Sequence, residues 1–442
     1  MSQFSKTSFL YSLLRIYSNF IYRRWFNTIE VNGEGNIPEG EPVIFAPNHQ
    51  NGLIDAMALL SSSPQPVVFW VRADLFKNKV VGAVLRSLKM MPAYRMRNGI
   101  QNLKKNVESI EHSDDVLLNN QFLCLMPEGG QEEQRTLRPL VKGIFRAAFS
   151  AQEKMENGKW VRIVPTGIDY GHYDKSGRHL VVTFGKPISI KDYKKSYEEN
   201  APVALNQIKE ELSNRIEPLM LNIRSAENYE TIYAAAYLYN WRMLQEMNIP
   251  DNETNRLAAR QRIVDILQCA ETESSCSELF EELKAVCEGW RNKNKDVAFS
   301  AKMQEYEGLD ADLIVKVFYL ILTLPLQLYS IVMNGLQFLI CKAGGKKMRG
   351  TGFEASVKFG LAGILLPITY IILTTIFGLS YSPDAMTTLC FAISLPLSFF
   401  FFQRYRWKFQ YVKERLKIFF TKPKEPKRVE SIIDQIRSLL GK

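Results

Sequence analysis

The chain has 442 residues, too many for one ordinary hydrophobic core, so two or more folded units are predicted. Its 56 Lys and Arg residues outnumber its 46 Asp and Glu residues, and a net charge of +10 suits nucleic acid, anionic lipid or a phosphorylated substrate equally well. Six scattered cysteines without a CxxC pair argue against a zinc site and a disulfide framework, and a reducing compartment is expected.

Residues 1–29 are predicted to form an amphipathic helix at a membrane interface. Leucines, isoleucines and aromatic residues between positions 8 and 22 share one broad side of that helix. Arg15, Arg23 and Arg24 interrupt the apolar run, and they would attract anionic headgroups. The alternative is a helix packed on its own domain. No small-residue cleavage site follows, so a signal peptide is not predicted.

Residues 30–200 are predicted to form a catalytic domain of the α/β class, with a mixed sheet flanked by helices. Strand-like runs alternate here with helical patterns such as 80–88 and 99–109. The strand candidates are "PVIFAP", "PVVFWV", "QFLCLMP", "WVRIVPTGI" and "LVVTFGKPI".

The remainder is predicted to be a helical appendage (201–312), a membrane region (313–403) and a basic cytoplasmic tail (404–442). Three uncharged runs, at 317–341, 359–383 and 385–403, have lengths near those needed for a hydrocarbon core of about 30 Å. Flanking Lys and Arg residues predict that the last two form a hairpin with cytoplasmic ends. A proline and three amide side chains weaken the first run, and a span there would place everything before it on the other side of the membrane. A re-entrant or in-plane segment is therefore preferred to a full span; the residues concerned are Pro325, Gln327, Asn334 and Gln337.

A histidine and an aspartate in "APNHQNGLIDAM" are the candidate catalytic residues. His49 follows a predicted strand, and a turn at Asn51 and Gly52 would bring Asp55 back to its ring. A carboxylate that fixes the imidazole tautomer makes histidine a base near neutral pH. Because the chain has no GxSxG elbow, the predicted target of this base is a substrate hydroxyl. The alternative is that Asp55 caps the next helix beside an unrelated loop histidine.

Three further segments place residue types that suit phosphate binding after predicted strands. "MPAYR" ends in Arg95, "LCLMPEGG" ends in Glu128, Gly129 and Gly130, and "IVPTGIDY" carries Pro165 at a predicted strand end. Ligand sites in α/β layers gather where strands meet their loops. Glycines admit an anion to main-chain N–H groups, and an arginine fork grips phosphate oxygens. Taken singly, each segment has a structural alternative: a tight turn, a solvated arginine or a strand terminator.

The order of these four segments resembles the glycerolipid acyltransferase family, which includes glycerol-3-phosphate, dihydroxyacetone phosphate and lysophosphatidate acyltransferases. The resemblance covers about residues 30–200. It implies that His49 is the general base and that Asp55 orients it. It also implies binding of the acceptor and its phosphate by a set of residues after the other strands: Arg95, Glu128, Gly129, Gly130 and Pro165.

Two departures from the family pattern concern spacing. Five residues separate His49 from Asp55 where four are usual. The longer gap is similar to that of a branch of the family that contains fungal-type glycerol-3-phosphate and dihydroxyacetone phosphate acyltransferases. It requires a bulge at Asn51–Gly52 if the two side chains are to meet. Gly130 stands where threonine is common, and the arginine expected soon after is displaced to Arg135 or Arg138. Lys142 is a further candidate contact for the phosphate or the acyl donor.

The resemblance implies an integral membrane O-acyltransferase of phospholipid synthesis, located in the cytoplasmic membrane if the source is bacterial. His49 would take the proton of a hydroxyl on glycerol-3-phosphate or its 1-acyl derivative, whose oxygen would attack an acyl thioester of coenzyme A or acyl-carrier protein. No metal or other cofactor is expected. Predicted partners are membrane lipids, the acyl donor and the phosphorylated acceptor, without nucleic acid, because the positive charge clusters beside apolar spans. Two alternatives stay open: another lyso-lipid or aminolipid acceptor, and a non-catalytic membrane scaffold.

Overall fold

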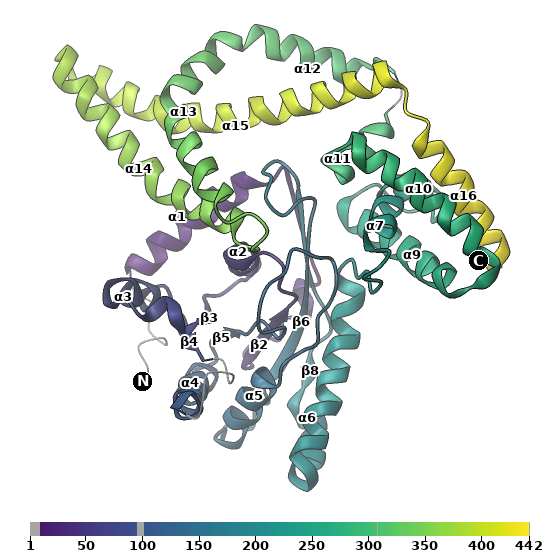
Figure 1. The fold of residues 1–442 in the computed structure, drawn as a ribbon. Helices are drawn as coiled ribbons and strands as arrows, with labels where there is room; N and C mark the ends of the chain where they lie inside the picture. Colours follow the sequence, from purple (N-terminus) through teal and green to yellow (C-terminus); the bar gives the residue numbers. More distant parts are fainter. Residues whose placement is uncertain (1–8, 95–100, 307, 442) are drawn as a thin grey trace. The chain divides into compact units, whose positions relative to one another are not determined.

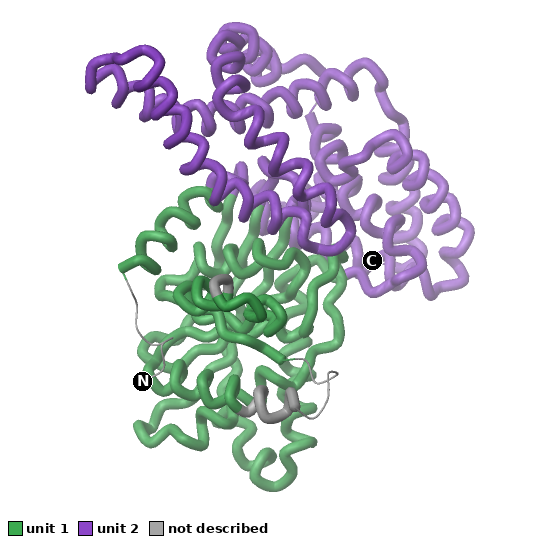
Figure 2. The backbone as a smooth tube through the Cα atoms, turned by 60° about the vertical axis from the view of Figure 1, so that its left-hand side comes forward, with its two compact units in different colours: residues 1–23, 29–170, 180–222 green, residues 24–28, 171–179, 223–442 purple. Residues whose placement is uncertain are grey.

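The computed structural model describes residues 9–94, 101–306 and 308–441, and the chain divides into two compact units (Figures 1 and 2). The first unit comprises Met1–Arg23, Ile29–Tyr170 and Leu180–Asn222, and the second comprises Arg24–Thr28, Gly171–His179 and Ile223–Lys442. The domain boundary predicted at residue 200 falls inside a helix of the first unit, where a kink lies at Asn200 two residues before Pro202. The first unit therefore continues past that boundary.

A mixed sheet lies at the centre of the first unit, as the alternating pattern predicted. Its path has the order β1-β7-β6-β2-β5-β3-β4, and β8 also pairs with β6. The run from β6 to β4 is parallel, whereas β7 and β8 are antiparallel to β6. The carboxyl ends of β2, β5 and β6 therefore share one edge. The strands are β1 (Thr28–Asn32), β2 (Val43–Pro47), β3 (Val67–Arg72), β4 (Met90–Ala93), β5 (Phe122–Cys124), β6 (Arg162–Tyr170), β7 (His179–Phe184) and β8 (Ile188–Ser189).

Helices α4, α5 and α6 cover one face of this sheet (Figure 1). Ile44 and Ala46 of β2 belong to the same buried cluster as residues of all three helices. Alternation along the strand turns Phe45 to the opposite face, where its ring lies 5.3 Å from Phe122 and 5.5 Å from Phe184. The helices of this unit are α1 (Phe9–Trp25), α2 (Gly52–Ser62), α3 (Lys79–Ser87), α4 (Gln101–Leu118), α5 (Gly143–Glu153) and α6 (Lys194–Ile216).

The described part of the second unit is helical apart from short strand ends and loops. The predicted basic tail consists of the last part of α15 followed by α16, which packs on α10 and α7. Tyr239 donates to Asp434 of α16 at 2.6 Å. The helices are α7 (Tyr229–Leu238), α8 (Asn240–Glu246), α9 (Glu253–Thr272), α10 (Ser277–Lys293), α11 (Val297–Gln304), α12 (Ala311–Leu322), α13 (Leu324–Lys346), α14 (Glu354–Tyr381), α15 (Ala385–Thr421) and α16 (Glu425–Leu440).

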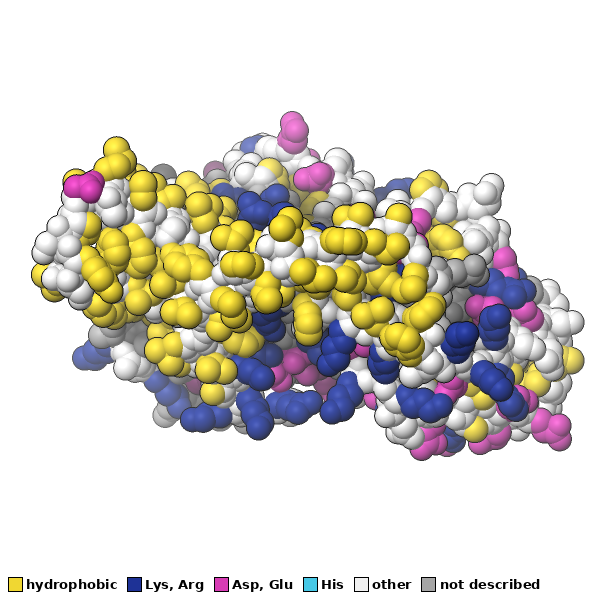
Figure 3. Space-filling model, turned by 90° about the horizontal axis from the view of Figure 1, so that it is seen from above, with side chains coloured by type: hydrophobic (Ala, Val, Ile, Leu, Met, Phe, Trp, Pro, Cys, Tyr) yellow, Lys and Arg dark blue, Asp and Glu magenta, His cyan; other side chains and the backbone are white. Residues whose placement is uncertain are grey.

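Helices α13, α14 and α15 are long and apolar enough to cross a membrane, by length and composition. Figure 3 shows apolar side chains gathered over the long helices of this unit. The predicted run 317–341 is not one helix, because α12 ends at Leu322 and α13 begins at Leu324, with Pro325 in its first turn. The runs predicted at 359–383 and 385–403 lie mainly within α14 and α15, which extend beyond them.

The polar residues of α13 lie on its buried face. This stripe has heptad-like spacing and consists of Gln327, Ser330, Asn334, Gln337, Cys341 and Gly345. Asn334 donates to Ser398 of α15 at 2.8 Å and accepts from Tyr370 of α14 at 2.8 Å. Polar residues that bond between helices are typical of membrane bundles whose apolar side chains face lipid. The amides of α13 are therefore no reason to prefer a re-entrant segment over a span.

Candidate active site

The loop between β2 and α2 brings His49 and Asp55 into contact, as predicted. The Nδ1 atom of His49 lies 2.9 Å from Oδ2 of Asp55. Gly52, the first residue of α2, has a φ of +47°, which glycine adopts without the penalty of a side chain. The predicted turn at Asn51–Gly52 is present, and it absorbs the fifth residue between the pair.

The buried carboxylate of Asp55 accepts hydrogen bonds from four donors. The main-chain N–H groups of Gln50 and Asn51 donate to Oδ2 at 2.8 and 2.7 Å, and the Tyr170 hydroxyl donates to Oδ1 at 2.7 Å. Because a carboxylate only accepts, Nδ1 of His49 carries the hydrogen in its bond to Oδ2. Nε2 is then the basic ring nitrogen, on a side chain that is 13% exposed. Asp55 thus fixes the tautomer of His49 as well as satisfying donors at the start of α2.

Glu128, at the loop after β5, holds the main chain of His49. Its Oε1 accepts from the His49 N–H at 2.7 Å, and its Oε2 accepts from Nε of Arg138 at 2.8 Å. Burial raises the pKa of the Glu128 carboxyl, although these two donors oppose that effect. Gly129 follows with a φ of +68°, and Arg138 also donates to the carbonyl of Gly130. The "PEGG" segment is therefore a turn that positions the loop of the histidine.

Strand β6 fixes the other side of that loop. The Asn48 side chain bonds both main-chain groups of Ile168, donating to its oxygen at 3.0 Å and accepting from its nitrogen at 2.7 Å. Pro165 lies opposite Ala46 in the parallel pairing of β2 and β6. Its predicted place at a strand end is wrong, because β6 continues to Tyr170. Pro165 acts here as part of the sheet beneath the site.

Arg135 is not placed as the phosphate ligand that the sequence suggested. It is 2% exposed, and its guanidinium donates to the carboxylate of Asp169 and to the carbonyl of Tyr170. Asp169 and Tyr170 are the last two residues of β6. The arginine is thus bound within the protein and supports the strand that carries Tyr170.

Two further residues, Lys142 and Arg95, were predicted to contact the phosphate. Lys142 is partly exposed and immediately precedes α5, whose first residue is Gly143. The N–H of Val141 donates to the carbonyl of Pro127 at 2.7 Å, which holds Lys142 beside the "PEGG" turn. Arg95 lies outside the described residues.

Sequence reasoning missed Tyr170, whose hydroxyl reaches Asp55, and Asp169, which pairs with Arg135. One weak signal was available. Residues alternate across a strand, so Thr166, Ile168 and Tyr170 share one face of β6. The polar end of Tyr170 on a buried strand required a partner, but nothing in the sequence specified that this partner is Asp55.

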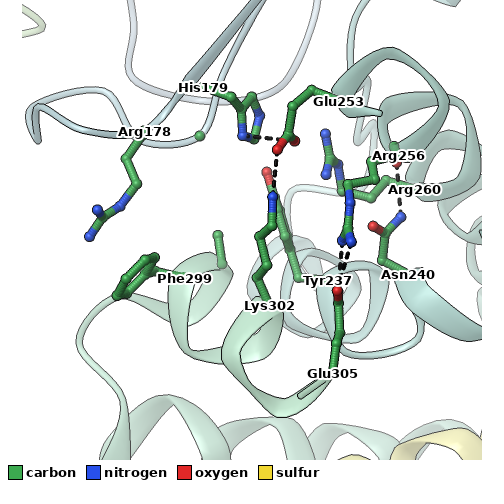
Figure 4. Close-up of a pocket in the computed structure, with 12 residues that line it drawn as sticks. Arg178, His179, Tyr237, Asn240, Glu253, Arg256, Arg260, Phe299, Lys302 and Glu305 are labelled. Carbon is green, nitrogen blue, oxygen red and sulfur yellow. Dashed lines mark hydrogen bonds and ion pairs between the residues drawn. The ribbon is translucent and has the colours of Figure 1, made fainter. Parts of the chain in front are cut away.

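A second charged cluster surrounds a pocket in the helical unit (Figure 4). Glu253 accepts from Lys302 at 2.6 Å and lies 3.0 Å from Nδ1 of His179, and Arg256 donates to Glu305 at 2.7 Å. Burial alone would raise the pKa of the Glu253 carboxyl, but His179 and Lys302 together hold that pKa well below its usual range. We interpret this cluster as a structural ion-pair network.

Comparison with known proteins finds similarity over the segment that contains His49 and Asp55. The sequence model described as Acyltransferase matches residues 28–169. The chain is 30% identical over 116 residues to "Glycerol-3-phosphate O-acyltransferase 1" of Saccharomyces cerevisiae, and 25% identical over 135 residues to "Glycerol-3-phosphate O-acyltransferase 2" of the same yeast. These alignments cover 26% and 30% of this chain, and 15% and 18% of the two yeast proteins.

A solved structure, that of the 1-acyl-sn-glycerophosphate (LPA) acyltransferase PlsC from Thermotoga maritima, aligns with a TM-score of 0.34 and 18% identity. This alignment covers 46% of this chain and 78% of that one. The segment matched by the family model contains His49, Asp55 and Glu128 and ends just before Tyr170. Residues 28–169 thus match the Acyltransferase family model, and the alignments span less than a fifth of the length of the two yeast relatives.

Proposed function

We propose that the chain is a membrane-bound O-acyltransferase. It moves a fatty acyl group from an acyl thioester to a hydroxyl of glycerol-3-phosphate or 1-acyl-glycerol-3-phosphate. The observation that carries this proposal is the hydrogen bond between His49 and a buried Asp55 at the carboxyl edge of the parallel strands. The names of the two yeast relatives support the same class of acceptor.

In this reaction His49 acts as a general base and then as a general acid. Its Nε2 takes the proton of the acceptor hydroxyl while the oxygen forms a bond to the thioester carbon. The tetrahedral intermediate collapses with cleavage of the carbon–sulfur bond, and the thiolate leaves as a thiol with the proton from His49. Asp55 stabilises the imidazolium between these two transfers. No covalent acyl-enzyme and no metal is required.

The acceptor phosphate is proposed to bind at the start of α5. The N–H groups in the first turn of a helix favour an anion, and Lys142 immediately precedes that turn. The turn at Gly129–Gly130 lies beside Lys142 through the bond between Val141 and Pro127. Arg95 remains a proposed ligand from the family resemblance.

The acyl donor is proposed to be acyl-coenzyme A or an acyl-carrier protein, without a further cofactor. The three long apolar helices support an integral membrane protein. We propose that the catalytic unit faces the cytoplasm, from which the acyl thioester and glycerol-3-phosphate would be supplied. This arrangement would deliver the lipid product directly to the bilayer.

The proposal is tested with purified full-length protein, a labelled acyl donor and both acceptors. We expect His49→Ala and Asp55→Ala to lose acyl transfer by a factor of about 10²–10⁴, the contribution of a general base. The matched control is His112→Ala, because His112 is a partly exposed residue of α4 whose charged neighbour is Glu108. It should transfer acyl groups at the wild-type rate.

Two results would redirect the assignment. Full activity of His49→Ala would favour a scaffold whose function does not depend on the catalytic pair. Activity on other lyso-lipids or aminolipids, unaffected by Lys142→Ala, would favour an acceptor without a phosphate requirement.

A further inference from the structure

One oxygen of the catalytic carboxylate is held by the main chain, and the other is held by a tyrosine. Oδ2 of Asp55 accepts from His49 and from the N–H groups of Gln50 and Asn51. Oδ1 accepts from the Tyr170 hydroxyl at 2.7 Å. Because a carboxylate rotates about its Cβ–Cγ bond, the bond at Oδ1 restrains the plane that points Oδ2 at the imidazole. Tyr170 therefore helps to orient the Asp55 carboxylate, which in turn orients the His49 imidazole.

The tyrosine is buried too deeply to reach a substrate. Tyr170 is 1% exposed, and Asp55 is also 1% exposed. Burial, followed by the charge of Asp55, raises the pKa of the Tyr170 hydroxyl well above its ordinary value. The hydroxyl thus keeps its proton at every working pH and stays a donor to Asp55.

A second buried tyrosine connects this pair to the N-terminal helix. Tyr22 of α1 is fully buried, and its single hydroxyl hydrogen is donated to the carbonyl of Ile54 at 3.1 Å, while the Tyr170 hydroxyl lies within hydrogen-bonding reach of the same oxygen. Ile54 immediately precedes Asp55 in α2. Helix α1 thus supports both the main chain next to Asp55 and Tyr170, whose hydroxyl donates to the Asp55 carboxylate.

Helix α1 is itself fastened to α2. Arg15 donates to the carbonyl of Ser63 at 3.0 Å, and Arg23 donates to the carbonyl of Ser61 at 3.1 Å. These carbonyls lie at the C-terminal end of α2, where the last main-chain oxygens lack helical partners and attract cations. Arg15 and Arg23, which were expected to attract lipid headgroups, also cap the helix that carries Asp55. The side of α1 opposite Tyr22 exposes apolar residues, among them Phe9, Leu13 and Ile16.

We propose that Tyr170 is a positioning residue for the His49–Asp55 pair and that Tyr22 extends this hydrogen-bonded chain into α1. The inference rests on the proposed acyl transfer by His49. It assigns α1 a part in catalysis, because the helix would keep the His49 imidazole oriented through Tyr22, Tyr170 and Asp55. The competing explanation is that both tyrosines only stabilise the fold.

The kinetic test uses Tyr170→Phe in the full-length protein, with acyl-coenzyme A as donor. We expect kcat to fall about tenfold, equivalent to about 1.4 kcal/mol, with the KM for the acceptor unchanged, because the hydroxyl touches no substrate. Without its donor, Asp55 attracts the proton on His49 more strongly, so the acid limb of the pH–rate profile should move to higher pH. A residue that only stabilises the fold would move neither kcat nor this limb in the folded protein.

Other titratable groups near His49 and Asp55 are the same in the wild type and in Tyr170→Phe, so they do not confound the comparison of these two proteins. Burial, followed by the charge of Asp55, raises the pKa of the Cys124 thiol in β5. Glu128 bonds the main chain of His49 and is paired with Arg138. The matched control is Tyr197→Phe. Tyr197 lies in the same unit and stacks on Phe149 with ring centroids 3.8 Å apart. This variant should stay within about twofold of wild type.

A second measurement is independent of turnover. The protein has four histidines, so histidine-selective NMR labelling gives a small set of imidazole signals, in which His49→Ala identifies that of His49. Tyr170→Phe should raise the titration midpoint of the His49 signal and leave the other signals in place. Tyr22→Phe should give a smaller shift in the same direction, because the hydroxyl that it removes is further from Asp55 than the Tyr170 hydroxyl. If Tyr170→Phe does not fold, Tyr22→Phe decides by the same two readouts.

The outcomes separate this inference from the function on which it rests. Wild-type kcat and an unshifted His49 titration in folded Tyr170→Phe would overturn the inference while an inactive His49→Ala leaves the acyltransferase proposal standing. Retained activity in His49→Ala would overturn both. An effect of Tyr170→Phe without any effect of Tyr22→Phe would overturn the extension to α1.

Discussion

Replacing Arg135 with methionine tests whether this arginine supports the fold or binds the substrate. Arg135 and Asp169 form an ion pair in which the two side chains are 2% and 1% exposed. Removing one member leaves a buried charge without compensation, which costs about 3–5 kcal/mol. In a domain of this size each kcal/mol lowers the melting temperature by about 2–4 °C. We therefore expect Arg135→Met to melt about 10 °C or more below wild type.

The assay combines thermal unfolding of the full-length protein in detergent with the KM for the acceptor at a temperature where the variant is folded. A double variant, Arg135→Met with Asp169→Leu, removes both charges and should recover a large part of the lost stability. The matched control is the exposed pair of Arg72 and Asp74, which are 2.7 Å apart with both side chains 45% exposed. Arg72→Met should cost less than about 1 kcal/mol.

The opposite pattern would refute this reasoning. If Arg135 bound the acceptor phosphate, Arg135→Met would raise the KM for glycerol-3-phosphate and leave the melting temperature near wild type. A double variant no more stable than the single one would likewise show that the pair is not the source of the stability.

Two further predictions concern the helical unit. Because the folded-state pKa of Glu253 is depressed, its contribution to stability is complete above the ordinary glutamate pKa of about 4.3 and is lost as the pH falls from there toward the folded-state pKa. Glu253→Gln should therefore flatten the fall in melting temperature below about pH 4.3, and an equally steep fall in that variant would contradict the assignment. Asn334→Leu removes the side chain that bonds α13 to α14 and α15, and it should lower the thermal stability of the detergent-solubilised bundle by about 1–2 kcal/mol. The control, Leu336→Ala on the exposed side of α13, should have a smaller effect, and equal losses would mean that the polar contacts contribute nothing specific.

The fold of the first unit was largely predictable because its strands are buried and rich in β-branched residues. Apolar runs such as "PVIFAP" mark β2 without reference to distant residues. The end of the unit was not predictable in the same way. Helix α6 carries charged and apolar residues like the helices after it, and only its packing on the sheet assigns it to the first unit. Periodicity reports which face of a helix is apolar, but not which partner covers that face.

The candidate site was predictable where its residues are close in sequence. His49 and Asp55 are joined by a short loop, so their contact could be expected from turn-forming residues alone. The partners of Arg135 lie more than 30 positions away, and an arginine after a glycine-rich turn suggested a phosphate ligand until the fold placed it beside Asp169. Tyr170 is separated from Asp55 by 115 positions. Contacts at such separations depend on strand order and register, which a single sequence does not reveal.

The end of β6 shows how one strand can serve the core and the His49–Asp55 pair at once. Ile168 holds the histidine loop through Asn48, Asp169 pairs with Arg135, and the hydroxyl of Tyr170 bonds Asp55. Successive side chains of a strand point to opposite faces, so the ion pair and the tyrosine bond lie on different sides of the same backbone. Arg135 also donates to the carbonyl of Tyr170 and thereby ties the two sides together. Loss of Arg135 should consequently slow turnover as well as lower stability, whereas loss of the Tyr170 hydroxyl should slow turnover with less effect on the melting temperature.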